Sequence, residues 1–526
     1  MLRNNRNRRS EKSTDDLRAQ IVTPSSPSKK SRPDSGRSRS SMLSALLLIL
    51  FVLTLLLHSS KRGHTSNHLK TVTLQQHQEG DDEKKRQEIL QEAIWSWDAY
   101  VKYAWGTDEL HPLSQSGGEW LGSMGLTLVD SLDTLLIMGL TDQFNDAREW
   151  VKTSLNFDQD VGVNLFEMSI RVLGGLLSAF ALSEDEIFLE KAVDLGERLL
   201  VAFETETKIP VSDVNLGKRK ALSLGPSSTS EISTLHLEFC YLSQLTERSE
   251  FCDAVTATDD KLAELAPSTE FPYLLPIMIN PKNAVLFGKV SLGARGDSYY
   301  EYLLKSWLQS GRTNHELKDR YLKAVNAIQI HLVQTTKTHG YVYIAELIGR
   351  ATSAKMDHLV CFLPGVLALG VHYGAGGDRE MKLAEDLLET CWKMYSQQPT
   401  GLGPEIAFFD KIKGEDIFVK DQDSHNLLRP ETAESLFVLW RLTHDVKYRE
   451  YGWSMFESFR KYARVDTGGY ASIDSVKTTD VTRRDKMESF WMAETLKYLF
   501  LLFSDDDTIS LEKYVLNTEA HPLPVF

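Results

Sequence analysis

One pattern recurs along most of this chain: a strongly apolar helical segment that begins near an acidic or polar residue. The segments begin, in order, at Asp130, Glu167, Glu231, Asp297, His358, Glu431 and Glu488. From Glu167 onward the steps between starts are 64, 66, 61, 73 and 57 residues, a length that holds two helices and their loops. No alternation of strands and helices of the βαβ kind is present. The pattern therefore predicts an all-α domain built from stacked helical hairpins.

The recurring segments are apolar nearly all round, which is typical of a buried inner layer of helices. Amphipathic stretches such as 379–392 lie between them and suit an outer layer. Seven such pairs that close on themselves would form an (α/α)7 barrel whose inner helices present their polar ends at one mouth. Each acid could instead merely interact with its own helix dipole, worth about 0.3–1 kcal/mol. Capping alone would select Ser and Thr as readily, so we favour a shared cavity.

The N-terminal part has a different composition. Residues 1–41 are rich in Ser, Pro and Arg and are predicted to form a disordered cytoplasmic tail. Residues 42–60 carry no formal charge and are mostly apolar, which predicts one transmembrane signal anchor. A cleaved signal peptide is the alternative, disfavoured by the long preceding tail. Residues 61–87 are interpreted as a lumenal stem and 88–526 as one catalytic domain, lumenal because more positive charge precedes the span than follows it.

Charge excludes one class of function. Residues 1–60 hold eleven Lys/Arg and four Asp/Glu, a net +7, and the whole chain carries −14, so the remainder carries −21. An acidic body argues against nucleic acid as a partner, because binding phosphates requires a basic surface. This excess of acidic residues is compatible with a cation site, although we expect most of them to lie on the solvated surface.

Seven segments, in order along the domain, resemble the class I α-1,2-mannosidases of glycoside hydrolase family 47. They are 129–140, 166–177, 295–305, 357–365, 428–435, 494–503 and 517–522. Together they cover nearly the whole predicted lumenal part. The resemblance implies a calcium-dependent inverting exo-α-1,2-mannosidase that trims high-mannose N-glycans of glycoproteins.

The resemblance also implies catalytic roles. Inversion needs one carboxylic acid on the leaving oxygen and one carboxylate that activates water, about 6.5–9.5 Å apart. Glu167 matches the acid, Glu431 the base, and Asp297 a third carboxylate that handles protons; which of the last two abstracts the proton stays open. Glu167 and Arg171 could instead form an ordinary i,i+4 ion pair.

The remaining family positions concern the sugar and the metal. Thr518 matches the direct calcium ligand, through its hydroxyl and carbonyl oxygens, which suit this hard cation. Glu434, Glu494 and Glu519 match residues that hold the metal's waters. The substrate-binding positions match Arg171, Arg295, His358, Arg429, Phe490 and Glu494. Phe490 would pack against the sugar, although a plain core role is the alternative, and an isolated His is more often a satisfied core residue.

Four cysteines lie in the predicted lumenal domain, where disulfides are permitted. None forms a CxxC pair, which makes zinc or a redox site unexpected. The resemblance implies a disulfide between Cys361 and Cys391. Cys240 and Cys252 have no matching family position; they could form a local bridge or stay free, and we favour free thiols.

Arg295 sets the expected specificity, because endoplasmic reticulum members of the family resemble this chain in having Arg there. We expect trimming of a nine-mannose glycan to one eight-mannose isomer, in the membrane of the endoplasmic reticulum or the Golgi. Two alternatives remain: a degradation-enhancing mannosidase-like protein of glycoprotein quality control, and a non-catalytic glycan-binding lectin. A lectin would not need the acid, the base and the calcium-contacting Thr together.

Overall fold

The computed structural model describes residues 80–222 and 225–526. The predicted tail, the predicted membrane anchor and most of the predicted stem lie outside these residues. The first described helix spans residues 80–104, so the part of the stem from 80 to 87 belongs to it. Asp82 in that helix pairs with Arg449, which ties its start to the rest of the domain.

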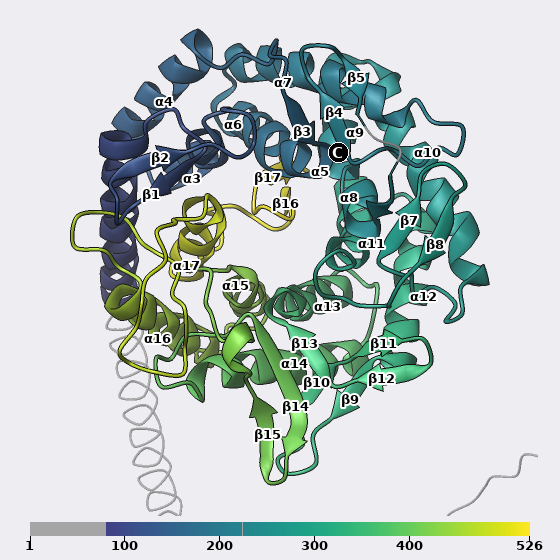
Figure 1. Ribbon diagram of the computed structural model, residues 1–526, viewed down its shortest axis with the longest axis vertical. Helices are drawn as coiled ribbons and strands as arrows, with labels where there is room; N and C mark the ends of the chain where they lie inside the picture. Colours follow the sequence, from purple (N-terminus) through teal and green to yellow (C-terminus); the bar gives the residue numbers. More distant parts are fainter. Residues whose placement is uncertain (1–79, 223–224) are drawn as a thin grey trace, which may run out of the picture. The chain divides into compact units, whose positions relative to one another are not determined.

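The described helices lie in two concentric rings (Figure 1). The inner ring comprises α2 (Leu126–Asp130), α3 (Leu132–Ile137), α5 (Leu165–Glu167), the π-helix η1 (Met168–Leu173), α6 (Gly174–Ser183), α8 (Thr229–Ser233), α9 (His236–Thr246), α11 (Asp297–Gln309), η4 (His358–Phe362), α13 (Leu363–His372), α15 (Glu431–Thr443), the π-helix η6 (Trp491–Thr495) and α17 (Leu496–Leu502). The outer ring comprises 80–104, α4 (Thr141–Thr153), α7 (Glu186–Leu199), α10 (Ser249–Leu265), α12 (His315–His331), α14 (Asp378–Ser396) and α16 (Lys447–Tyr462), with short turns η2 (Leu200–Phe203), η3 (Ala266–Ser268) and η5 (Asp421–Asp423) elsewhere. The prediction of a mostly helical domain is confirmed.

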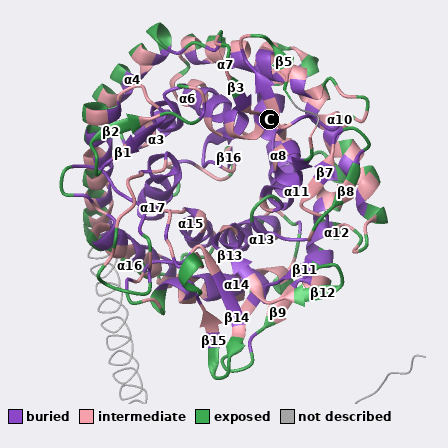
Figure 2. Ribbon diagram, in the orientation of Figure 1, coloured by how far each residue is buried: buried purple, intermediate pink, exposed green. Residues whose placement is uncertain are grey.

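Burial separates the two rings (Figure 2). In α11 every residue from Ser298 to Gln309 is buried, as expected for a helix that is apolar nearly all round. In outer α14 the buried residues include Leu383, Leu387 and Cys391, spaced four apart, so one face packs inward and the other meets solvent. The sequence pattern therefore assigned both layers, although Asp130 ends α2 instead of beginning a helix.

One described helical run, Leu165–Ser183, is long and apolar enough to cross a membrane. It has a mean hydropathy of 1.6, and 67% of it is buried within the domain. Since α5, η1 and α6 make up this run and belong to the inner ring, its apolar character is accounted for by core packing.

The strands are short and pair antiparallel. The pairs and sheets are β1 (Glu109–His111) with β2 (Ser116–Gly118); β3 (Gly162–Asn164), β4 (Asp213–Asn215) and β5 (Lys220–Ala221); β6 (Ser227–Ser228), β7 (Met278–Asn280) and β8 (Val285–Phe287); β9 (Val333–Thr335) with β10 (Val342–Ile344); β11 (Glu346–Ile348) with β12 (Ala351–Ser353); β13 (Lys355–Asp357), β14 (Ile406–Ile412) and β15 (Glu415–Phe418); and β16 (Tyr514–Leu516) with β17 (Pro522–Pro524). The helical pattern did not predict these strands.

The positions of the strands along the chain explain where they lie in the fold. Strands β1 to β15 all lie in connections that lead from an outer helix to the next inner one. Such connections meet at the end where inner helices begin. The opposite connections are tight, and three of them turn on a left-handed residue: Glu184 (φ 57°), Glu247 (φ 55°) and His444 (φ 54°). The end where the inner helices begin therefore carries the strands and longer loops, and the opposite end carries short turns.

The hairpin β16–β17 is the exception, because it lies inside the inner ring (Figure 1). Its turn is anchored by Asn517, whose side-chain amide donates to Ile170 O (2.9 Å) and to Glu238 Oε1 (2.7 Å). His521 contacts Asp130 (3.1 Å) and Asp133 (3.0 Å), both fully buried. These contacts hold the turn in the centre of the domain.

Two disulfides each join an inner element to an outer helix. Cys361 in η4 is bonded to Cys391 in α14, as the resemblance implied. Cys240 in α9 is bonded to Cys252 in α10, so the prediction of free thiols there was wrong. The turn between α9 and α10 is only two residues long, so the two helices pack against each other, and Cys240 and Cys252 both lie within two turns of it.

Candidate active site

A cavity of about 280 Å³ opens at the end where the inner helices begin. It is lined by Phe166, Glu167, Ile170, Arg171, Ser228, Ser230, Glu231, Ala294, Arg295, Asp297, Ser298, Glu301, Leu359, Phe362, Arg429, Pro430, Glu431, Glu434, Phe490, Glu494, Thr518 and Glu519. The three predicted catalytic carboxylates thus converge from three different inner elements. Every other predicted substrate or metal residue lines the same cavity except His358, which lies behind Glu431.

Glu167 is positioned by a helix start. The Asn164 side chain accepts a hydrogen bond from Glu167 N (3.1 Å) and caps α5. One turn on, Arg171 Nε donates to Glu167 Oε2 (2.7 Å). The same guanidinium lies 2.8 Å from Glu519 Oε1 and 3.7 Å from Asp130 Oδ2. Arg171 is therefore more than an ordinary i,i+4 partner, because it connects Glu167 to the turn of the C-terminal hairpin.

Asp297 opens α11 and is hydrogen-bonded at one oxygen. Ser230 Oγ donates to its Oδ1 (2.7 Å), and Ser298 N donates to the same atom (2.8 Å). Burial nevertheless raises the pKa of Asp297 to about 6, and the nearby carboxylates of Glu301 and Glu431 act in the same direction. This carboxyl group can therefore exchange a proton near neutral pH.

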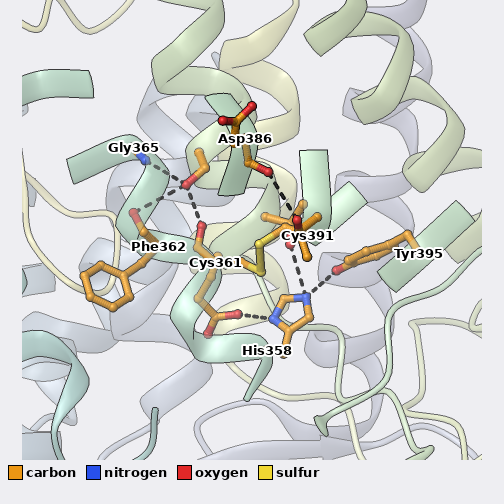
Figure 3. Close-up of a disulfide and its surroundings, with 11 residues drawn as sticks. His358, Cys361, Phe362, Gly365, Asp386, Cys391 and Tyr395 are labelled. Atoms are coloured by element: carbon orange, nitrogen blue, oxygen red, sulfur yellow. Dashed lines mark hydrogen bonds and ion pairs between the residues drawn. A yellow bond between two sulfur atoms is a disulfide. The ribbon is translucent and has the colours of Figure 1, made fainter. Parts of the chain in front are cut away.

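Glu431 opens α15 and has the opposite environment. His358 Nδ1 lies 2.5 Å from Glu431 Oε2, and His358 Nε2 lies 2.6 Å from the Tyr395 hydroxyl (Figure 3). Burial alone would raise the pKa of Glu431, but the contact with His358 and the positive charge of Arg429 outweigh it, and the pKa is lowered. Glu431 is thus the carboxylate that stays ionised while Asp297 titrates.

A third side of the cavity is aromatic and basic. Phe490 is 9% exposed, and the guanidinium carbons of Arg171 and Arg429 lie 5.8 and 5.9 Å from its ring centroid. Arg429 is held by a forked pair of hydrogen bonds to Glu405, Nε to Oε2 (2.7 Å) and Nη2 to Oε1 (2.6 Å). The forked contact fixes the guanidinium plane, so this wall is rigid.

Arg295 differs from the other two arginines because it is exposed at the rim. Its backbone is left-handed (φ 77°), and its Nη1 lies 3.6 Å from Met278 Sδ. Among residues 80–222 and 225–526, no acidic side chain lies within ion-pair distance of it. Within the described residues, Arg295 therefore does not serve merely as the ion-pair partner of a neighbouring acid.

The floor is a cluster of carboxylates around Thr518. Thr518 Oγ1 donates to Glu301 Oε2 (2.9 Å), and Lys305 Nζ lies 2.5 Å from Glu301 and 3.2 Å from Glu434. Burial raises the pKa of Glu434 to about 7 and that of Glu519 to about 8.

Glu494, also at the floor, has its pKa raised by burial and by the neighbouring Glu519. Glu519 Oε2 is buried and receives no hydrogen bond from the described residues. A concentration of hard oxygen donors with so few positive partners fits a divalent cation such as Ca²⁺.

Several residues of the site were not predicted. Ser230 and Glu301 line the cavity beside the predicted residues. Glu405 and Tyr395 lie outside its lining and hold Arg429 and His358, and Glu238 holds the turn through Asn517. Glu301 could have been found, because it lies one helical turn after Asp297. The others depend on contacts between elements distant in sequence, for which the helical pattern contains no signal.

Comparison with known proteins places these features in a family. The family model described as glycosyl hydrolase family 47 matches residues 92–525. The chain belongs to glycosyl hydrolase family 47. As a member of that family it is a glycosidase, and the cavity with its three carboxylates is where such chemistry fits.

Individual relatives agree with this assignment. This family 47 chain is 48% identical over 454 residues to the endoplasmic reticulum mannosyl-oligosaccharide 1,2-alpha-mannosidase of Mus musculus, covering 84% of this chain and 68% of that protein. The Schizosaccharomyces pombe protein of the same name is 45% identical, with 82% and 88% covered. The structure of an alpha-1,2-mannosidase from Trichoderma reesei is similar with a TM-score of 0.79 and 28% identity, covering 84% of this chain and 99% of that one.

Proposed function

We propose that this glycosidase is a calcium-dependent, inverting exo-α-1,2-mannosidase that trims high-mannose N-glycans. The observation that carries the proposal is the convergence of Glu167, Asp297 and Glu431 on one cavity whose floor is Thr518 and its carboxylates. The names of the mouse and fission yeast relatives supply the substrate class.

The proposed mechanism uses the different environments of the carboxyl groups, which raise the pKa of Asp297 and lower that of Glu431. Glu167, held by Arg171, protonates the leaving glycosidic oxygen. Glu431, kept ionised beside His358, accepts a proton from the attacking water on the opposite face of the sugar. Asp297, with a pKa of about 6, is the group that exchanges protons with Glu431 or solvent between turnovers.

Calcium is part of the proposal, and Thr518 would bind it through its hydroxyl and carbonyl oxygens. Glu434, Glu494 and Glu519 would hold its waters, and Glu301, which already accepts a hydrogen bond from the Thr518 hydroxyl, joins them. When bound, the ion would orient sugar hydroxyl groups at the floor of the cavity. The protein's own contribution is a turn fixed in place by Asn517.

The proposal also includes the architecture of the domain and the cellular compartment of the enzyme. We propose that the alternating inner and outer helices form an (α/α)7 barrel, and the contact between η6 and α2 supports closure at that point. The relatives named as endoplasmic reticulum enzymes support residence in that compartment. Residues 42–60, outside the described part, would anchor the enzyme as a single-pass type II protein, with residues 88–526 in the lumen.

Specificity is assigned to Arg295 at the rim. An unpaired guanidinium offers several donors to sugar hydroxyl groups, and a site built on such bonds rejects glycans that leave the donors unsatisfied. We propose that a nine-mannose glycan is trimmed to a single eight-mannose isomer.

The test is digestion of a purified nine-mannose N-glycan, with isomer analysis of the product and proton NMR of the released sugar. One eight-mannose isomer, β-mannose as the first anomer formed, and loss of activity with a chelator are expected. Release of α-mannose would show a retaining mechanism, and binding without hydrolysis would indicate a lectin. Slow hydrolysis restricted to glycoproteins would favour a quality-control protein.

A further inference from the structure

A second cavity, of about 350 Å³, lies away from the proposed active site. It is lined by residues of α9, α10 and α12 and by the end of α11, including Ser306, Gln309 and Ser310. Asp297, in the active-site cavity, is at the opposite end of α11. At 1.5 Å per residue, Asp297 in the first cavity and Gln309 in the second lie about 18 Å apart along this helix.

Three side chains on the wall of this cavity have the chemistry of metal ligands. His236 and Cys240 lie one helical turn apart on α9, and Cys252 faces them from α10. One ligand atom from each lies within 4.8 Å of the others. Asp259 Oδ2 lies 2.8 Å from His236 Nδ1, which fixes the ring, and no described residue is hydrogen-bonded to Nε2. A carboxylate behind a histidine is the usual support of a histidine metal ligand.

The other disulfide provides a comparison within the same chain. His358 precedes Cys361 by three residues on η4, so the Cys361–Cys391 bridge also has a histidine close by in the sequence, and Figure 3 draws the three residues. Both nitrogens of His358 are engaged, by Glu431 and by Tyr395. Both sulfur-bearing residues are fully buried. The Cys361–Cys391 bridge with His358 therefore offers no metal site. The Cys240–Cys252 bridge differs, because His236 Nε2 has no described partner and the bridge faces a cavity.

We propose that the Cys240–Cys252 disulfide masks a zinc site formed with His236, which becomes available when the bridge is reduced. A dithiol supplies the two electrons: it becomes a disulfide, and its two protons pass to Cys240 and Cys252 as thiols. Zn²⁺ then replaces both thiol protons, which are released to solvent, and His236 Nε2 completes a set of three protein ligands. In the bridged state neither sulfur is a thiolate, so the ion does not bind.

Zinc suits this donor set. Two thiolates and one imidazole suit a borderline-soft ion that prefers four ligands. The fourth position would face the cavity and take a water molecule. The cavity also gives a reductant access, because Cys252 is partly exposed and both cysteines line it.

The experiment uses the full-length chain with excess Ca²⁺ to occupy the carboxylate floor. The protein is treated with dithiothreitol, freed of reductant under anaerobic conditions, and titrated with Zn²⁺ against a chromophoric chelator. Cobalt(II) is titrated in parallel, because thiolate ligands give a charge-transfer band. The variants are C240S/C252S, which retains Cys361 and Cys391, H236Q, and D259N, with circular dichroism as the folding check.

Reduced wild type is expected to bind one more equivalent of zinc than C240S/C252S, and unreduced wild type none more. H236Q should lose affinity by at least tenfold, and D259N by about 10–100-fold, the usual effect of removing such a support. The proposal is overturned if reduced wild type and C240S/C252S bind equal zinc, if cobalt shows no thiolate band, or if maleimide mapping shows that the bridge resists reduction in folded protein.

Discussion

His358 connects Glu431 to Tyr395 through its two ring nitrogens, at 2.5 and 2.6 Å. Burial raises the pKa of Tyr395, so its hydroxyl stays protonated and can donate to Nε2 while Nδ1–H donates to the carboxylate. The imidazole is thereby held in one orientation and stabilises Glu431 as an anion. Asp297 has no such partner, and this difference is the basis of the first prediction.

Ser230→Ala should move the inflection of kcat/KM attributed to Asp297 to higher pH. The Ser230 hydroxyl donates to Asp297 at 2.7 Å and stabilises its ionised form, so its loss raises a pKa that is already about 6. The displacement is upward whether activity needs the ionised or the protonated form. Ser233→Ala is the matched control, because the Ser233 hydroxyl donates only to Thr229 O. Superimposable pH profiles would refute the assignment.

Glu167→Gln should lower hydrolysis by about 10²–10⁴, the usual contribution of a general acid or base. The amide can keep a hydrogen bond to Arg171 but cannot donate a proton to the leaving oxygen. Hydrolysis of the nine-mannose glycan and the melting temperature are measured together. Glu190→Gln, at an exposed position of outer helix α7, is the control. Wild-type activity in the folded Gln variant would show that another group is the acid.

The sequence predicted the parts of the fold and site that are local. Asp297 and Glu431 are the first residues of α11 and α15, because a polar residue before an apolar run marks where an inner helix begins. The roles of Glu405 and Tyr395 depend on contacts with Arg429 and His358 across different elements. No helical periodicity specifies which partners meet in this way.

The Cys240–Cys252 bridge was missed for a different reason. The two cysteines lie 12 residues apart, on either side of a turn that begins after Thr246 and ends before Ser249. Exact helix ends were needed to see that they oppose each other, and ends are the least certain part of a helix prediction.

Removal of calcium should abolish activity and lower the melting temperature. An ion that binds only the folded state stabilises it by about 2.7 kcal/mol at a concentration 100 times its Kd. Dialysis against EDTA, followed by calorimetry and return of Ca²⁺ or Mg²⁺, is the measurement, with recovery expected for Ca²⁺. Thr518→Ala should lose the stabilisation by Ca²⁺, whereas Thr153→Ala on outer helix α4 should keep it. Full activity without bound metal would disprove the calcium site.

Arg295→Leu should broaden the product distribution from one eight-mannose isomer toward five mannoses. Arg295 is exposed at the rim and left without an acidic partner by the described residues, so its donors are free for sugar hydroxyl groups. The time course of a nine-mannose digestion is followed for both proteins at equal activity. Arg350→Leu, at an exposed arginine that pairs with Glu270, is the control. If the wild type itself trims readily to five mannoses, Arg295 does not set the specificity.

Cys361→Ala/Cys391→Ala should lower the free energy of unfolding by about 3–4 kcal/mol, the chain-entropy value for a 30-residue loop. Denaturant unfolding of wild type and variant measures the difference. In native protein both cysteines should resist alkylation, since they are bonded and fully buried. Labelling of either residue before reduction would show that the bridge is absent.

The hairpin β16–β17 also determines when during synthesis the site can first exist. The hydrogen bond from Asn517 to Ile170 joins residues 347 apart in the chain. At about 5–20 residues per second, a ribosome delivers the Glu167 wall roughly 20–70 s before the floor that completes it. Until the hairpin inserts, Glu238 lacks the amide of Asn517, and Asp133 lacks the imidazole of His521. On the proposed function, the nascent chain is therefore inactive while nearly all its helices have already been synthesised, and activity first becomes possible when the hairpin inserts.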